Sequence, residues 1–151
     1  MTADLRDLYQ EVVVDHSRRP RNFGPLPDAS HQAEGFNPLC GDRLNLYLKV
    51  VDGFIEDARF EGSGCAISMA SASLMTEAMK GRRTTDAEAL FSDFHAMLTG
   101  NPKTNPALGK LEVFAGVSEF PSRIKCATLA WHTLQAALHA EVQPVTTESI
   151  A

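Results

Sequence analysis

Residues 44–61, LNLYLKVVDGFIEDARFE, carry the clearest structural signal in the chain. Leu44, Leu46, Leu48 and Val50 alternate with more polar residues, which is the period of a strand with one buried face. The dipeptide Asp-Gly at 52–53 is the strongest short signal for a tight β-turn. Residues 54–61 then read as the returning strand. We therefore predict a β-hairpin, against which the other segments must pack.

The segments on either side of this hairpin are expected to supply one more strand and several helices. The third strand is predicted at 30–36, before the hairpin. Helices with apolar residues at helical spacing are predicted at 5–15, 66–80, 86–98, 108–117 and 124–141. This order predicts an α+β fold. We expect a small three-stranded antiparallel sheet with an N-terminal helix and several C-terminal helices packed on one face.

Length and charge narrow the class of protein. The chain of 151 residues fits one domain, 1–151, with an ordered core at about 5–139 and a frayed tail at 142–151. Its 14 basic and 19 acidic residues give a net charge of −5 without a basic stripe, so nucleic acid is not an expected partner. No apolar run is long enough to span a bilayer, and the N-terminus lacks the apolar core of a secretion signal. We therefore expect a cytoplasmic protein with no membrane partner.

The three cysteines lie at junctions between loops and regular elements. An odd number in a reducing compartment argues against a disulfide framework, and the plainest interpretation is three small buried side chains. Their settings favour another one. Cys40 lies in a predicted turn, and Cys65 opens a predicted helix, whose free N–H groups favour a thiolate. Cys126 lies in the first turn of the last predicted helix.

A carboxylate and two cations accompany these thiols. Asp42 follows Cys40 by two residues and could bind the same metal, or it could equally be a turn residue bonding its own backbone. Three thiolates and one carboxylate would form a tetrahedral site suited to zinc or an iron–sulfur cluster. Gaps of 24 and 60 residues between the cysteines exclude a zinc finger, so such a site would form only on folding. Arg123 and Lys125 flank the last cysteine and could stabilise thiolate charge or contact a partner, although Lys125 could equally be a plain exposed cation.

Two features stay open. The five histidines share no ligand spacing, so no role is assigned to them. The arginine- and proline-rich loop at 18–27 is either a solvated connector or a docking surface.

Three segments resemble the cysteine motifs of the IscU/NifU-like iron–sulfur cluster assembly family. They are NPLCGD at 37–42, GSGCAIS at 62–68 and RIKCATLAW at 123–131. Asp15-His16 followed by PRNFG at 20–24 is similar to the family's N-terminal signature. The likeness covers about 5–139, nearly the whole chain.

Two details are similar to the SufU-type zinc-dependent sulfurtransferase branch of that family. Lys125 stands where the scaffold branch has a histidine before the third cysteine. The segment between Cys65 and Cys126 is also longer than in the scaffold branch. The expected fold is therefore IscU/SufU-like.

This resemblance implies a tight zinc site made by Cys40, Asp42, Cys65 and Cys126. It also implies two kinds of partner: a SufS-type pyridoxal-phosphate-dependent cysteine desulfurase and downstream iron–sulfur assembly proteins. In SufU-type proteins the counterpart of Cys40 accepts persulfide sulfur once a histidine of the partner replaces it on the zinc. The chain is thus expected to take sulfur on Cys40 and pass it on. The alternatives are a scaffold that assembles a [2Fe–2S] cluster on the same ligands, and a non-catalytic domain with a purely structural zinc.

Overall fold

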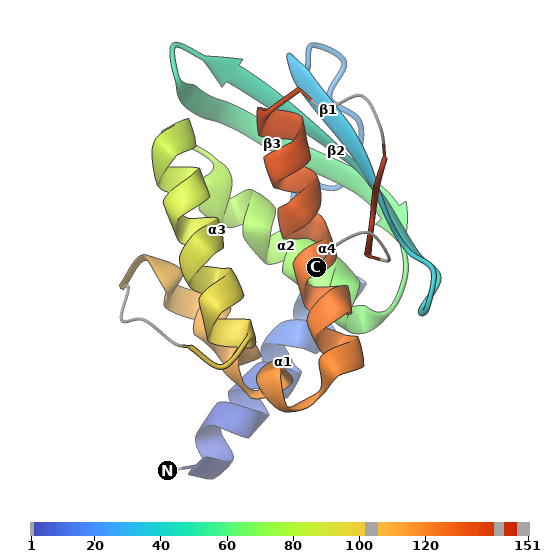
Figure 1. The fold of residues 1–151 in the computed structure, drawn as a ribbon, viewed down its shortest axis with the longest axis vertical. Helices are drawn as coiled ribbons and strands as arrows, with labels where there is room; N and C mark the ends of the chain where they lie inside the picture. The colour runs from blue at the N-terminus through green and yellow to red at the C-terminus, as the bar shows by residue number, and fades with distance from the viewer. Residues whose placement is uncertain (1, 102–105, 141–143, 148–151) are drawn as a thin grey trace.

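A computed structural model describes residues 2–101, 106–140 and 144–147 (Figure 1). Its elements, in chain order, are α1 (Thr2–Arg18), β1 (His31–Asn37), β2 (Asp42–Val51), β3 (Phe54–Ser63), α2 (Ala66–Met79), α3 (Thr84–Leu98), the 3₁₀ segment η1 (Pro106–Glu119), α4 (Pro121–Leu138) and β4 (Val145–Thr146). The α+β fold predicted from the sequence is confirmed. No helix within the described residues has the length and apolar character needed to cross a bilayer.

The predicted hairpin is confirmed as β2 and β3. Leu44, Leu46 and Leu48 are all buried on one face of β2, as the alternation requires. Asp52 and Gly53 have φ values of +52° and +80°, and two positive φ angles define the tight turn that matches the twist of a hairpin. Residues 44–61 therefore do set the centre of the sheet.

The sheet has four strands in the order β3-β2-β1-β4, so the expectation of three strands was wrong. β1, β2 and β3 pair antiparallel, and β4 pairs parallel with β1. The added strand lies within the tail that was predicted to fray at 142–151, and its two residues pair with Gly35 and Phe36 of β1. Other residues of that tail lie outside the described residues. A strand of two residues has no alternation that a sequence pattern could reveal.

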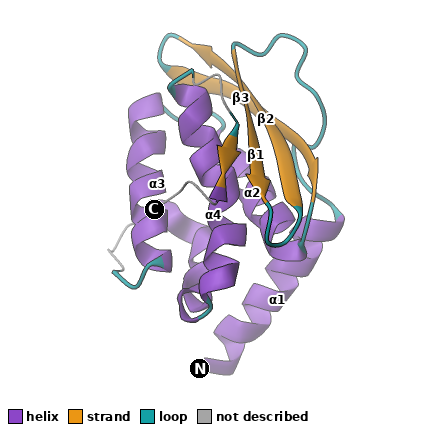
Figure 2. Ribbon diagram, turned by 45° about the vertical axis from the view of Figure 1, so that its right-hand side comes forward, coloured by secondary structure: helices purple, strands orange, loops and turns teal. Residues whose placement is uncertain are grey.

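The helices gather on one face of the sheet, as predicted (Figure 2). α2 and α4 pack directly on the strands, while α1, α3 and η1 pack on those two helices. Trp131 lies fully buried at the centre and stacks on Phe94 with ring centroids 4.4 Å apart. The helices thus form two layers, and the inner layer holds α4 against β1 and β2.

Two helix boundaries differ from the prediction. α4 begins at Pro121 instead of residue 124. Proline fits there because the N–H groups of a first helical turn have no partner within the helix, so the missing N–H of proline costs no hydrogen bond. The expected helix at 108–117 is the longer segment η1, which breaks at Gly109, where φ is +48° and ψ is −122°.

Candidate metal centre

The three cysteines and Asp42 come together at one end of the sheet. Cys40 lies in the turn between β1 and β2, where Gly41 takes a φ of +72°, and Asp42 is the first residue of β2. The ligand atoms of Cys40, Asp42 and Cys126 all lie within 4.8 Å of one another. The Sγ atoms of Cys40 and Cys126 are 3.3 Å apart. The turn lies at the lower right of Figure 1, on the side where α2 begins.

Cys65 joins this group through two neighbours. Its Sγ lies 3.9 Å from Oδ2 of Asp42, and its interaction with Cys126 shifts the pKa of both thiols. Its backbone N–H donates to Oδ1 of Asp42 at 2.8 Å. The Sγ also caps α2 by accepting from the N–H of Ser68 at 3.4 Å. Cys65 therefore adjoins the group formed by Cys40, Asp42 and Cys126, although its Sγ does not lie within 4.8 Å of all three.

The approach of Cys65 to Asp42 depends on a glycine. A Cβ built on Gly64 would overlap Oδ1 of the Asp42 carboxylate and lie 3.0 Å from its Cγ. Any side chain at this position would push the carboxylate away from the thiols. The glycine before Cys65 is thus a packing requirement of the site.

A buried amide ties two of the candidate ligands together. Asn37 is fully buried, and its Nδ2 donates to Oδ2 of Asp42 at 3.0 Å and to Sγ of Cys126 at 3.4 Å. Its Oδ1 accepts from Oγ1 of Thr147 at 3.0 Å. Asn37 therefore fixes the relative positions of an aspartate from β2 and a cysteine from α4.

The donor set fits a zinc ion. Four ligands arranged tetrahedrally at roughly 2.3 Å from a metal would lie about 3.8 Å from one another. The separations between ligand atoms lie on both sides of this value: the Sγ atoms of Cys40 and Cys126 are 3.3 Å apart, and no two ligand atoms of Cys40, Asp42 and Cys126 are more than 4.8 Å apart. Three soft thiolates and one carboxylate suit zinc or iron–sulfur chemistry and do not suit magnesium or calcium.

The thiols of the metal-free cluster have unequal acidities. The pKa of Cys65 falls to about 7, chiefly because it accepts a hydrogen bond from Cys126, with a further contribution from the N–H of Ser68. The pKa of Cys126 is raised, chiefly by that same hydrogen bond and then by burial. The cluster therefore favours a thiolate on Cys65 and a proton on Cys126 before a metal displaces it.

The cluster is open to solvent on one side. Cys126 is buried and Cys65 is half-buried, whereas Cys40 is exposed. The neighbouring Leu39 has 65% of its surface exposed. Cys40 is consequently the thiol that another macromolecule can reach.

The two cations predicted beside the third cysteine occupy the first turns of α4. Arg123 is exposed, and its guanidinium lies 4.5 Å from the ring centroid of Phe120. Burial raises the pKa of Tyr9, the positive charge of Arg123 opposes this rise, and Cys65 adds to it. Arg123 and Cys65 are thus both within electrostatic range of one phenol. Lys125 is half-buried next to Cys126.

The histidines do not join the cluster within the described residues. His16 is buried, and its Nδ1 lies 2.7 Å from Oγ of Ser73 in α2. His132 lies beside His95, with ring centroids 5.7 Å apart, and burial lowers its pKa to about 4. These three histidines serve packing between helices.

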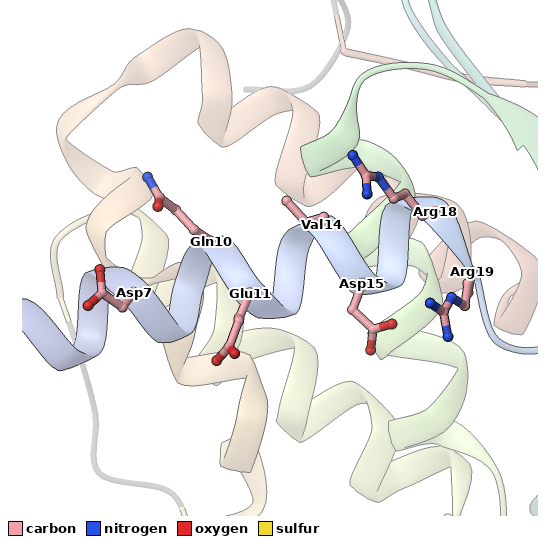
Figure 3. A pocket seen from close by; sticks show the side chains of 7 residues that line it. All are labelled: Asp7, Gln10, Glu11, Val14, Asp15, Arg18 and Arg19. Atoms are coloured by element: carbon pink, nitrogen blue, oxygen red, sulfur yellow. The ribbon is translucent and has the colours of Figure 1, made fainter.

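The loop at 18–27 folds back onto the body of the molecule. Arg21 forms an ion pair of 2.7 Å with Asp15, and Phe23 pairs with Phe60 at the edge of β3. The adjoining hollow is lined by the side chains of α1 and by Arg19 just after it (Figure 3). Because one side of a single helix lines it, this hollow is an open surface rather than a site between elements.

Asn37 and Thr147 were not among the residues predicted from the sequence to form the site. A signal existed for the first, because Ala33, Gly35 and Asn37 alternate onto the buried face of β1. A buried amide on that face must find hydrogen-bond partners, and the adjacent Cys40 turn could provide them. No comparable signal marks Thr147, which reaches the site only because β4 forms.

Comparison with known proteins agrees with this architecture. Residues 8–127 match the family described as NifU-like N terminal domain. The zinc-dependent sulfurtransferase SufU of Bacillus subtilis (strain 168) is 47% identical over 88% of this chain and 90% of its own length. The iron–sulfur cluster assembly scaffold protein IscU of Streptococcus pyogenes serotype M1 is 44% identical over 98% of this chain and 94% of its own.

A solved structure is similar over the same span. A SUF-system iron–sulfur cluster assembly scaffold protein from Fervidobacterium islandicum AW-1 superimposes with a TM-score of 0.82, at 34% identity over 88% of this chain and 98% of that one. The family match includes all three cysteines. The relatives and the solved structure each cover 88% or more of the chain. The protein therefore belongs to the NifU-like N-terminal domain family.

Proposed function

We propose that this protein is a zinc-dependent sulfur acceptor in iron–sulfur cluster assembly. Its donor would be a SufS-type pyridoxal-phosphate-dependent cysteine desulfurase, and its acceptor residue is Cys40. The observation that carries the proposal is the exposure of Cys40 at the rim of a cluster whose other thiols are half-buried or buried. The functions named for the SufU and IscU relatives support the same process.

The zinc ion would be held by Cys40, Asp42, Cys65 and Cys126. Bound zinc would keep the thiolates deprotonated at neutral pH without doing redox chemistry itself. Asn37 keeps Asp42 and Cys126 in place, and the N-terminus of α2 supports Cys65. A free thiol cluster of this kind needs reducing surroundings, which favours a cytoplasmic location.

The transfer is a thiol–disulfide exchange. The Cys40 thiolate attacks the outer sulfur of the desulfurase persulfide, so a new S–S bond forms at Cys40 while the S–S bond of the donor breaks. The electron pair of the broken bond leaves on the donor cysteine as a thiolate, and the outer sulfur keeps its proton. No oxidant or reductant is consumed. Passing the sulfur on repeats the same exchange with Cys40 as donor.

Arg123 is proposed to stabilise the charge on sulfur during this transfer or to contact the desulfurase. Its guanidinium is exposed at the same end as the thiols. Lys125 is proposed for the same role, since it directly precedes Cys126. The exposed Leu39 directly precedes Cys40 and provides apolar surface at which a partner could dock.

A scaffold role is the second candidate, because several relatives are named as IscU scaffold proteins and the same donors can bind a [2Fe–2S] cluster. Lys125 in the position before Cys126 favours the sulfur acceptor. The two candidates differ in the product that forms on the ligands.

The deciding experiment combines metal analysis with mass spectrometry. Anaerobically purified protein would be incubated with a cysteine desulfurase and cysteine, and its peptides analysed without reductant. The sulfur acceptor predicts zinc in the protein and one added sulfur atom on the Cys40 peptide, which is absent from C40A. Iron with acid-labile sulfide and no persulfide on Cys40 would favour the scaffold. Zinc without any sulfur transfer would leave only a structural metal.

A further inference from the structure

The C-terminal segment 145–147 reaches the proposed metal centre through one hydroxyl group. Oγ1 of Thr147 donates to Oδ1 of Asn37 at 3.0 Å, and Nδ2 of Asn37 contacts Asp42 and Cys126. Thr147 has 1% of its surface exposed and Asn37 has none. This contact joins two residues that are 110 positions apart in the sequence, and Asn37 is the last residue of β1.

The orientation of the Asn37 amide explains why this hydroxyl matters. A carboxylate can only accept hydrogen bonds, so the amide nitrogen must face Asp42 and Cys126. The carbonyl oxygen of Asn37 then points the other way into the interior. Among the described residues, the hydroxyl of Thr147 donates the hydrogen bond that this oxygen accepts. Without it, a buried acceptor would lack a partner, which is costly in a protein interior.

The pairing of β4 with β1 places Thr147, the residue directly after β4, beside Asn37. Gly35 of β1 lies opposite Val145, and Phe36 lies opposite Thr146, in parallel register. Val145 packs against the hydrophobic core. Thr147 directly follows this paired segment, and its hydroxyl meets the amide of Asn37.

We infer that Thr147 is a positioning residue for the metal ligands and that it acts through Asn37. This inference rests on the zinc site of the proposed function. The hydroxyl holds the amide in the one orientation that supports both Asp42 and Cys126. The segment 145–147 is thereby part of the outer support of the metal centre.

The energetic consequence runs in both directions. Loss of a hydrogen-bond partner around metal ligands lowers affinity by roughly 10- to 100-fold, and we expect about 10-fold for Thr147 because it acts through a second residue. Coupling between two sites is reciprocal. Zinc binding should therefore slow amide hydrogen exchange in 145–147, because it stabilises the orientation of Asn37 that Thr147 binds.

The test compares three variants of the full chain by competition for zinc with a chromogenic chelator. T147V removes the hydroxyl and keeps the shape of the side chain, whereas T147S keeps the hydroxyl. T133V is the matched control, because Thr133 is also fully buried but its hydroxyl bonds to the carbonyl of Leu129 inside α4. We expect about 10-fold weaker zinc binding for T147V, with T147S and T133V within roughly 3-fold of the wild type.

Hydrogen exchange on the wild-type protein gives a readout that needs no variant. The inference predicts slower exchange at 145–147 in the zinc-loaded than in the metal-free protein. Equal zinc affinity of T147V and wild type would overturn the inference, as would exchange at 145–147 that does not respond to zinc. A wild type that binds no zinc would overturn the proposed function as well, so the two failures are distinguishable.

Discussion

Substitution of Gly64 by alanine should damage the site by displacing Asp42. The new Cβ would overlap Oδ1 of the carboxylate and lie 3.0 Å from Cγ and 3.1 Å from Cα of Asp42. Asp42 is 1% exposed and accepts hydrogen bonds from the N–H of Cys65 and from Asn37, so it cannot move without breaking one of them. Overpacking of this kind costs about 1–3 kcal/mol.

The assay is urea unfolding of the metal-free protein in the presence of a reductant. A loss of about 2 kcal/mol, divided by a urea dependence of roughly 2 kcal/mol per molar, lowers the unfolding midpoint by about 1 M. Gly116→Ala is the matched control, because a Cβ on Gly116 meets nothing within 4 Å. Its midpoint should stay within roughly 0.3 M of the wild type, as expected for a surface change. Equal midpoints for the two variants would refute the packing argument at Gly64.

Two further outcomes follow from the same geometry. In the metal-free protein, alkylation of Cys65 should rise with pH around a midpoint of about 7, because Cys126 lowers the pKa of this thiol and the thiolate is the reactive form. Cys126, whose pKa is raised, should stay unreactive. A midpoint for Cys65 near the ordinary value of 9 would contradict this assignment. Gly35→Ala should cost about 1–3 kcal/mol in urea unfolding, because its Cβ would overlap Oγ1 of Thr133 across the β1–α4 contact. Thr133→Ala in the same chain should restore part of that loss, and strictly additive effects of the two substitutions would exclude the clash.

The central parts of the fold are encoded locally and could be predicted. The leucines of β2 alternate with more polar residues, which is the pattern of a strand with one buried face. The Asp-Gly turn then sets the register of β3 against β2. The sequence also placed the thiols at junctions between elements and Asp42 two residues after Cys40, while the family resemblance implied that all four form one site. These features depend on short segments and on one hydrophobic pattern.

The parts that escaped prediction depend on contacts between distant segments. β4 has two residues, and only its pairing with β1 makes it a strand. Asn37 stands inside a quoted motif, but its role appears only when Cys126, 89 residues away, is placed beside it. α4 begins before the predicted residue 124, because a proline in the first turn can begin a helix. Sequence patterns report the period of a segment and not the partner that will pack against it.

The central claim is that Cys40, Asp42, Cys65 and Cys126 bind one zinc ion. Zinc X-ray absorption on the stoichiometric complex tests it most directly. The account predicts three sulfur neighbours at about 2.3 Å and one oxygen neighbour at about 2.0 Å, falling to two sulfurs in C65A. Nitrogen neighbours from histidine in place of sulfur, or fewer than three sulfurs in the wild type, would contradict it.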